Sequence, residues 1–96
     1  MLARLSRIQG SPDRIDRAVP IFQESTDQVQ QLPGFEGAYL LVAKEGGQIV
    51  TLTLWNSESD MNASAPTAED ILARAAERAG SEAPPQIETY EVLLEV

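Results

Sequence analysis

The 96-residue chain contains no cysteine and no histidine. Without cysteine it can form no disulfide and offers no thiolate to a metal ion or a substrate. Without histidine it lacks the commonest general base, the commonest transition-metal ligand and the usual axial ligand of heme. Acid–base chemistry would therefore depend on Asp, Glu, Lys or Tyr, or on the substrate itself. We accordingly expect no metal, no heme and no other cofactor.

Basic residues are scarce as well. Seven Lys and Arg stand against 15 Asp and Glu, so the formal net charge is −8. Nucleic-acid binding requires a basic stripe, which a chain of this composition does not provide. No apolar run reaches the length of a membrane span, and the N-terminus lacks a signal-peptide pattern. We therefore expect no nucleic-acid partner, no membrane partner and a cytoplasmic location.

The chain has no internal repeat and no linker long enough to divide it. Its length is that of one domain, which we take to span residues 1–96. A domain of this size buries only a modest core, so a partner subunit would add to its stability.

The densest aliphatic run, residues 32–56, contains the single Trp and one of the two Tyr. It is typical of two strands joined by a tight turn, because Gly46 and Gly47 adopt positive φ at no steric cost. If residues 45–47 form a three-residue loop, Lys44 pairs with Gln48. This stretch is therefore predicted to be a hairpin.

The predicted register separates the side chains of the hairpin into two faces. One face is wholly aliphatic, and we expect the helices to pack on it. The other carries Tyr39, Thr53 and Trp55, and it suits a ligand cavity or a second sheet. The sequence leaves open whether Tyr39 and Trp55 line a cavity or are ordinary core aromatics. The aliphatic face consists of Ala38, Leu40, Val42, Val50, Leu52 and Leu54.

A further strand is expected at each end of the chain, over residues 1–9 and 87–96. After the first of them, Ser11 can serve as a helix N-cap, and apolar residues follow at helical spacing as far as Val29. Pro20 lies inside this pattern and lacks the N–H that an α-helix requires. We therefore expect a kink in this helix at Pro20.

A second helical region follows the hairpin. Ser57 and Asp60 have the spacing of a capping box, and Thr67 and Asp70 repeat it after an intervening proline. The pattern predicts a short helix and then a firmer one, which Gly80 ends as its C-terminal cap.

The expected order of elements is strand, helix, strand, strand, helix, strand. With the central strands paired, this is the split βαβ of a ferredoxin-like α+β fold (βαββαβ), an antiparallel sheet with helices on one face. The other sheet face would remain bare. A small domain rarely exposes a whole apolar sheet face to water, so we expect a homodimer.

Particular stretches also carry a resemblance to a known family. They are LPGFEGA at residues 32–38, the Gly46–Gly47 turn, TLTLWNSE at residues 51–58, a closing strand at residues 90–92, and Pro20 before the Pro-Gly-Phe turn. In these features the chain resembles dimeric α+β barrel proteins of the antibiotic biosynthesis monooxygenase (ABM) type. The resemblance implies a homodimeric barrel of two sheets packed face to face, with a pocket in each subunit between sheet and helices.

Proteins of this family differ in their chemistry. Its heme-degrading members use a helical His to bind iron, and they place a Trp in the helix where this chain has residues 61–64 (MNAS). Its cofactor-free oxygenases act on phenolic polyketides and also use a Trp on the helix side. Trp55 matches instead the Trp at the strand end. The resemblance therefore assigns no catalytic residue to this chain.

Two functions remain open, in addition to isomerase-like or decarboxylase-like activities of relatives with the same fold. The first is a dimeric small-molecule binding or accessory module without chemistry, which the shortage of titratable pocket candidates favours. The alternative is a cofactor-independent monooxygenase whose phenolic or quinol substrate itself reduces oxygen. In both cases the ligand would be a small aromatic molecule. The candidate pocket residues are Phe22, Tyr39, Thr53, Trp55, Asn62 and Tyr90.

Overall fold

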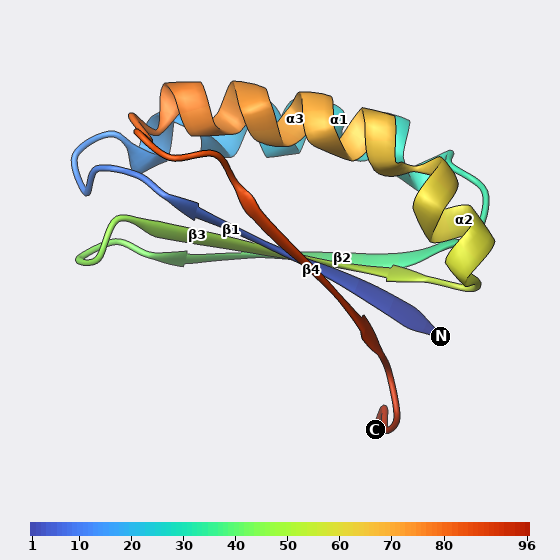
Figure 1. Ribbon diagram of the computed structural model, residues 1–96. Helices are drawn as coiled ribbons and strands as arrows, with labels where there is room; N and C mark the ends of the chain where they lie inside the picture. Colours follow the sequence, from blue (N-terminus) through green and yellow to red (C-terminus); the bar gives the residue numbers. More distant parts are fainter.

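Four antiparallel strands form one sheet in the computed structural model, which describes residues 1–96 (Figure 1). The strands are β1 (Leu2–Gln9), β2 (Phe35–Ala43), β3 (Gln48–Trp55) and β4 (Gln86–Glu91), in the order β2-β3-β1-β4. The helices are the 3-10 helix η1 (Ile15–Arg17), α1 (Val19–Gln30), α2 (Glu58–Ala63) and α3 (Ala65–Arg78). None of these helices is long and apolar enough to cross a membrane.

The helices α1 and α3 lie side by side over one face of the sheet, and the short α2 lies at its end (Figure 1). The opposite face carries no helix. This arrangement confirms the predicted ferredoxin-like α+β fold.

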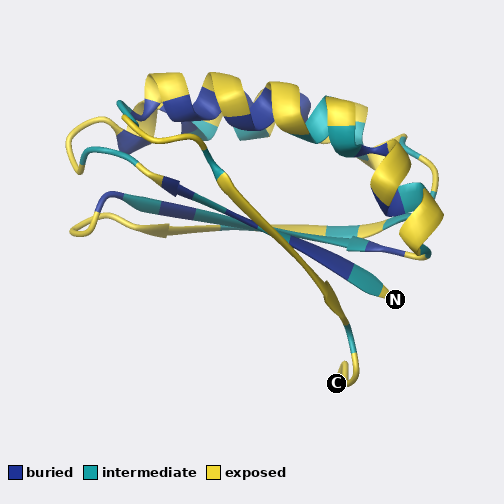
Figure 2. Ribbon diagram, viewed as in Figure 1, coloured by how far each residue is buried: buried dark blue, intermediate teal, exposed yellow.

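The hydrophobic core lies between the helices and the sheet. Ile8 and Ile49 rise from neighbouring strands and meet Ile15, Ile21 and Ala75, and all five are buried. The inward side of α3 is correspondingly dark in Figure 2. The small alanines of α3 let that helix approach the bulky isoleucines of the sheet closely.

The β2–β3 pairing differs by one residue from the expected register. Ala43, not Lys44, pairs with Gln48, so the loop has four residues, Lys44–Gly47. Gly47 has φ +65°, and a Cβ there would lie 2.5 Å from the Gly10 carbonyl oxygen. Its own carbonyl accepts a hydrogen bond of 2.7 Å from the Gly10 N–H. The predicted three-residue loop is wrong because the turn is fixed by this contact with the end of β1.

A shift of one residue exchanges the two faces of a strand relative to its neighbour. Tyr39 pairs with Leu52, whereas Ala38 pairs with Thr53. Thr53 and Trp55 therefore point toward the helices, and Tyr39 points to the bare face. The predicted face that combines Tyr39 with Thr53 and Trp55 is wrong. The aliphatic side chains expected under the helices but found on the bare face are Val50, Leu52 and Leu54.

Pro20 and Pro66 lie at the beginnings of helices and do not interrupt them. Pro20 occupies the first turn of α1, after η1, and Pro66 occupies the first turn of α3. The first backbone N–H groups of a helix have no intrahelical partner, so proline costs nothing there. The predicted kink at Pro20 is therefore wrong. The capping box predicted at Thr67 is wrong as well, because α3 has already begun at Ala65.

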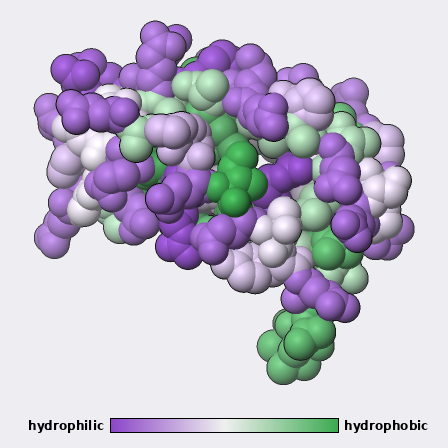
Figure 3. Space-filling model, viewed as in Figure 1, coloured by the Kyte–Doolittle hydropathy of each residue, from purple (hydrophilic) through white to green (hydrophobic).

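The last strand is shorter than expected, since β4 ends at Glu91. The Val92 N–H still donates to the Met1 carbonyl at 2.9 Å, but the following residues leave the sheet. Leu93 is 87% exposed and Leu94 is 81% exposed. The C-terminal end of the chain projects below the body of the molecule (Figure 1), and Figure 3 shows hydrophobic atoms gathered at that place. In the C-terminal segment 92–96, the apolar side chains of Leu93, Leu94 and Val96 thus remain exposed within the subunit.

Two predicted helix boundaries are confirmed. The Ser57 hydroxyl accepts a hydrogen bond of 3.1 Å from the Asp60 N–H and caps α2. Gly80 follows α3 with φ +74°, which glycine adopts without strain.

Replacing Ser57 by Ala should lower the free energy of unfolding by about 1 kcal/mol, because the Asp60 N–H loses its acceptor. The matched control is Thr67→Ala, which should not lower it, since Thr67 caps nothing and Ala is the better helix former. Urea denaturation followed by circular dichroism measures both. Equal losses in the two variants would contradict the helix boundaries.

Candidate ligand-binding cavity

A cavity of about 570 Å³ lies between the helix-covered face of the sheet and the helices α1 and α3. Sites for small organic molecules typically have about 300–1,000 Å³. The walls are formed by aromatic side chains of three elements and by aliphatic ones from the sheet and from α3. The main apolar wall residues are Phe22, Phe35, Trp55, Leu40, Ile71 and Leu72.

The cavity exists because the sheet carries short side chains beneath it. Ser6 of β1 pairs with Thr51 of β3, and both belong to the helix-covered face. Two residues along the same strands, Ile8 and Ile49 fill the space under the helices. The helix α3 contributes the small Ala68 to the cavity wall, beside Thr67, Ile71 and Leu72. Protein interiors are close-packed, so this many small residues facing one another leave an open volume.

Trp55 lines the cavity and belongs at the same time to the core. It is 1% exposed, and its indole N–H donates to the Thr53 hydroxyl at 2.9 Å. Its ring meets Phe35 edge to face, with 5.7 Å between ring centroids. Such contacts hold an aromatic wall rigidly. The two roles that the sequence left open for Trp55 are therefore not exclusive.

Arg4 brings a positive charge into this apolar surrounding. It is 6% exposed and lies on β1 beside Thr53. Its Nη1 donates to the Ser64 hydroxyl at 2.9 Å, and its Nη2 donates to the Met61 carbonyl at 2.6 Å. Both acceptors are neutral. These two hydrogen bonds join the sheet to the corner between α2 and α3.

The electrostatic surroundings of Arg4 compensate its charge only weakly. Its guanidinium carbon lies 5.8 Å from the centroid of the Trp55 ring, within reach of a cation–π interaction. The ion pairs of the structure do not include Arg4. Burial lowers the pKa of Arg4, and the more distant charge of Glu69 opposes this shift. An arginine remains protonated at neutral pH even so.

Of the six predicted pocket residues, Phe22, Thr53 and Trp55 line this cavity together. Tyr39 lies at its edge on β2, but the residue is 61% exposed and its side chain belongs to the bare face. Asn62 is exposed on α2 and is not part of the cavity wall. Whether any of these residues binds a ligand stays a prediction.

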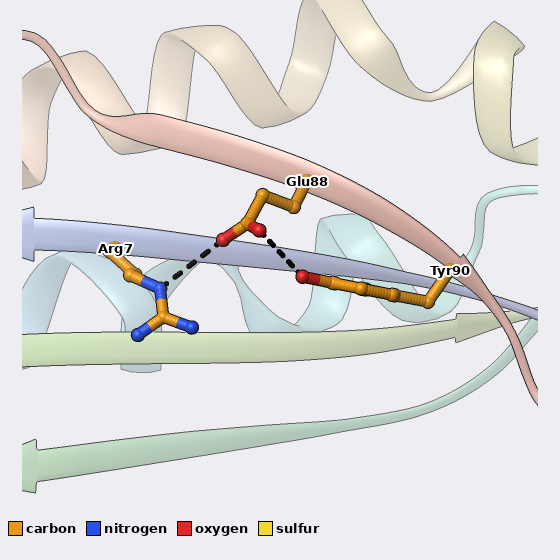
Figure 4. A network of polar contacts seen from close by, with 3 residues as sticks. All are labelled: Arg7, Glu88 and Tyr90. Atoms are coloured by element: carbon orange, nitrogen blue, oxygen red, sulfur yellow. Dashed lines mark hydrogen bonds and ion pairs between the residues drawn. The ribbon is translucent and has the colours of Figure 1, made fainter.

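Tyr90 lies on the bare face, in a polar network with β1 (Figure 4). Its hydroxyl donates to Glu88 Oε2 at 2.5 Å, and Arg7 Nε lies 3.3 Å from Glu88 Oε1. The hydrogen bond from Tyr90, and then that from Arg7, lowers the pKa of Glu88, and the same bond raises the pKa of Tyr90. Within one subunit Asn62 and Tyr90 do not join Trp55 in the cavity wall, whereas Tyr39 reaches the edge of the cavity from β2.

Sequence reasoning missed Arg4 and its partner Ser64 as cavity residues. A signal was present: Arg4 is the single charge on the face of β1 that also carries Leu2 and Ile8. A charged residue between two inward apolar ones indicates a buried polar function. Ser64 gave no such signal, because its position depends on the corner between two helices.

The acidic side chains do not gather into a possible metal site. With no His or Cys, carboxylates are the remaining strong ligands, and no three of them lie close enough to hold one ion. The ionisable residues of the cavity wall are Arg4, Glu36 and Tyr39, of which only Arg4 is buried.

The model of the family described as antibiotic biosynthesis monooxygenase matches residues 1–69, which include Arg4, the hairpin and the beginning of α3. This chain belongs to that family. Among curated protein sequences, none matches this ABM domain.

Solved structures share the fold of the ABM domain over nearly its whole length. NE2512, a protein of unknown function from Nitrosomonas europaea, gives a TM-score of 0.80 at 18% identity, over 99% of this chain and 91% of that one. The monooxygenase from the gene ActVA-Orf6 of Streptomyces coelicolor, solved with the ligand nanaomycin D, gives a TM-score of 0.80 at 17% identity, over 99% and 89%.

A third structure is the heme-degrader MhuD (Rv3592) from Mycobacterium tuberculosis, with two hemes bound in its active site. It gives a TM-score of 0.75 at 24% identity, over 100% of this chain and 99% of that one. At these identities the likeness establishes the fold. One fold hosts different ligands, so the ligand must be argued from the cavity itself.

Trp55→Phe should lower the free energy of unfolding by about 1–3 kcal/mol, because ring volume and the hydrogen bond to Thr53 are both lost. Tyr39→Phe is the control, with a change within about 0.5 kcal/mol, since this ring is exposed. Guanidinium denaturation followed by circular dichroism compares them. A change of under 0.5 kcal/mol, on the same scale, in the Trp55 variant would exclude a core role.

Proposed function

We propose that this ABM domain is a homodimeric binding module that takes up a small aromatic molecule in the cavity of each subunit. The observation that carries the proposal is the preformed cavity of about 570 Å³ with aromatic walls from α1, β2 and β3. A ring inserted between Phe22 and Trp55 would replace water at apolar surface, which favours binding.

The side chains of the cavity favour binding over catalysis. No Asp or Glu is buried in its wall, and Glu36, the one carboxylate there, is exposed. The Thr53 hydroxyl is already occupied by the indole of Trp55. A general base must lie within hydrogen-bond reach of the proton it removes. The lining thus offers rigid walls and one cation, with no buried base.

A cofactor-independent monooxygenase is the second candidate function. The family match favours it, as does the likeness to the ActVA-Orf6 monooxygenase with its bound ligand. In such a reaction an activated CH2 group of the substrate becomes C=O, one oxygen atom of dioxygen enters the product, and the other leaves as water. The substrate supplies all the electrons, so the protein needs only to bind and orient it.

The bare sheet face supports the proposed homodimer. Tyr39 is 61% exposed and Leu41 is 53% exposed, and they lie beside the aliphatic residues of β3. Glu88 on the same face is already bonded to Arg7 and Tyr90 (Figure 4), so a second copy could cover it without isolating its charge. The exposed C-terminal segment 92–96 adds apolar surface of its own. A cytoplasmic location stays a prediction.

Titration with 2-naphthol should quench the fluorescence of Trp55 saturably, and Ala68→Phe should abolish binding by filling the cavity. Ala73→Phe is the matched control, because Ala73 is exposed on the same helix. Calorimetry checks the affinity independently, and circular dichroism checks the fold. Binding that survives Ala68→Phe would place the ligand elsewhere.

An incubation with isotopically labelled dioxygen distinguishes the two candidate functions. With a phenol that carries an activated CH2 group, label in the product that disappears in Ala68→Phe would support the monooxygenase. Saturable binding with no label in the product would support the binding module.

Leu41→Glu should weaken the dimer at least about tenfold, since it places a charge on the apolar face that the second copy would cover. Ala73→Glu puts the same charge on the outer side of α3 and should change nothing. Sedimentation velocity at micromolar concentration measures the dissociation. A wild-type protein that sediments only as a monomer would refute the dimer.

A further inference from the structure

We infer that the cavity selects aromatic ligands that carry a negatively charged oxygen group, carboxylate or phenolate, and that Arg4 binds this group. The inference rests on the proposed function, that the cavity takes up an aromatic molecule. It adds the charge of the ligand and the residue that recognises it.

The guanidinium of Arg4 has donors to spare. Arginine carries five N–H donors, and two side-chain hydrogen bonds of Arg4 are formed within the protein, to Ser64 and to Met61. Its Nε has no protein partner. No buried side-chain nitrogen of the structure lacks a partner, so this Nε is not sealed inside the protein. Because Arg4 lines the cavity, the unused N–H groups are available to a molecule in it.

Arg4 forms no ion pair with a carboxylate, although the more distant Glu69 acts on its charge. Its two acceptors are a hydroxyl and a backbone carbonyl, both neutral. A buried charge without a partner is costly, and an anion beside it removes much of that cost. Hydrogen bonds between a guanidinium and a carboxylate are about twice as strong as neutral ones and are often bidentate. An anionic ligand would therefore gain more at this position than a neutral one of equal shape.

The geometry sets the aromatic ring and the anionic group side by side. Arg4 and Trp55 lie 5.8 Å apart, measured from guanidinium carbon to ring centroid, and both belong to the cavity wall. An oxygen anion bound to Arg4 thus places the attached ring along the apolar walls. The bound anion also lies close enough to Trp55 for its binding to change the fluorescence of the indole.

The protein as a whole would repel such a ligand. Its net charge is −8, so long-range attraction cannot produce a preference for anions. Any preference for the charged member of a matched pair of ligands must therefore come from a local cation, and Arg4 is the one buried in the cavity wall.

Arg4 also has a structural role, because its hydrogen bonds hold the corner between α2 and α3. Loss of stability in a variant would therefore not test the inference. A ratio of two affinities does, because damage to the cavity affects both ligands, whereas loss of the cation affects only the charged one.

The experiment measures 2-naphthoate and 2-naphthamide, which share the ring system and differ by one charge. Calorimetry and Trp55 fluorescence give both dissociation constants in low salt at neutral pH. In the wild type, naphthoate should bind about 10- to 100-fold more tightly, the range expected for a charge-assisted hydrogen bond. In Arg4→Met this ratio should fall to about one, while naphthamide still binds.

If Arg4→Met does not fold, Arg4→Lys keeps the charge and loses the planar fork. It should lower the affinity for naphthoate several-fold and leave that for naphthamide unchanged. Equal affinities in the wild type would overturn the inference and leave the proposed function standing, because an aromatic ligand would still be bound. An unchanged ratio in both variants would overturn the role of Arg4. Binding of neither ligand would overturn the proposed function, and the inference with it.

Discussion

The pairing register between β2 and β3 is the constraint on which the rest of the structure depends. Ala43 pairs with Gln48, and from that pair the whole hairpin is assigned to its two faces. Thr51 and Thr53 come to lie under the helices and leave room for the cavity. The aliphatic residues Val50, Leu52 and Leu54 lie on the bare face, where they favour contact with a second subunit. If β3 keeps its pairing with β1, a β2 shifted by one residue would turn Tyr39 and Leu41 toward the helices and Leu40 and Val42 to the bare face.

The order of the elements could be predicted because each leaves a local trace in the sequence. Ser57 marks the beginning of α2 and Gly80 the end of α3, and the chemistry of a cap acts within a few residues. The register could not be predicted in this way. It depends on Gly47 meeting Gly10, a contact between segments far apart in the chain. Pro20 was ambiguous for a related reason, since a proline in a first turn and a proline at a kink differ only in where the helix begins.

The difference between local sequence patterns and contacts of distant segments also explains which residues of the candidate site could be predicted. Phe22 was predicted from its place on an apolar helix face, and Thr53 and Trp55 from the face of β3 that they share, and all three line the cavity. The placement of Tyr39 depended on the register alone. The polar part of the site, where Arg4 meets the helix corner, arises from side-chain hydrogen bonds that join β1 to residues about sixty positions away. No local pattern encodes such a contact.

Along the helix-covered face of the sheet, core-forming residues lie at one end and cavity-lining residues at the other. This separation affects how the sequence of such a domain can change in evolution. Ile8 and Ile49 support the fold at one end, whereas Ser6 and Thr51 shape the binding volume at the other. Substitutions at the second pair change the size and polarity of the cavity without opening a hole in the packed core, so most of the stability is kept. Single substitutions of small side chains can then change which ligand the same backbone binds. Within the same strands, one pair of residues determines ligand choice and another pair determines stability.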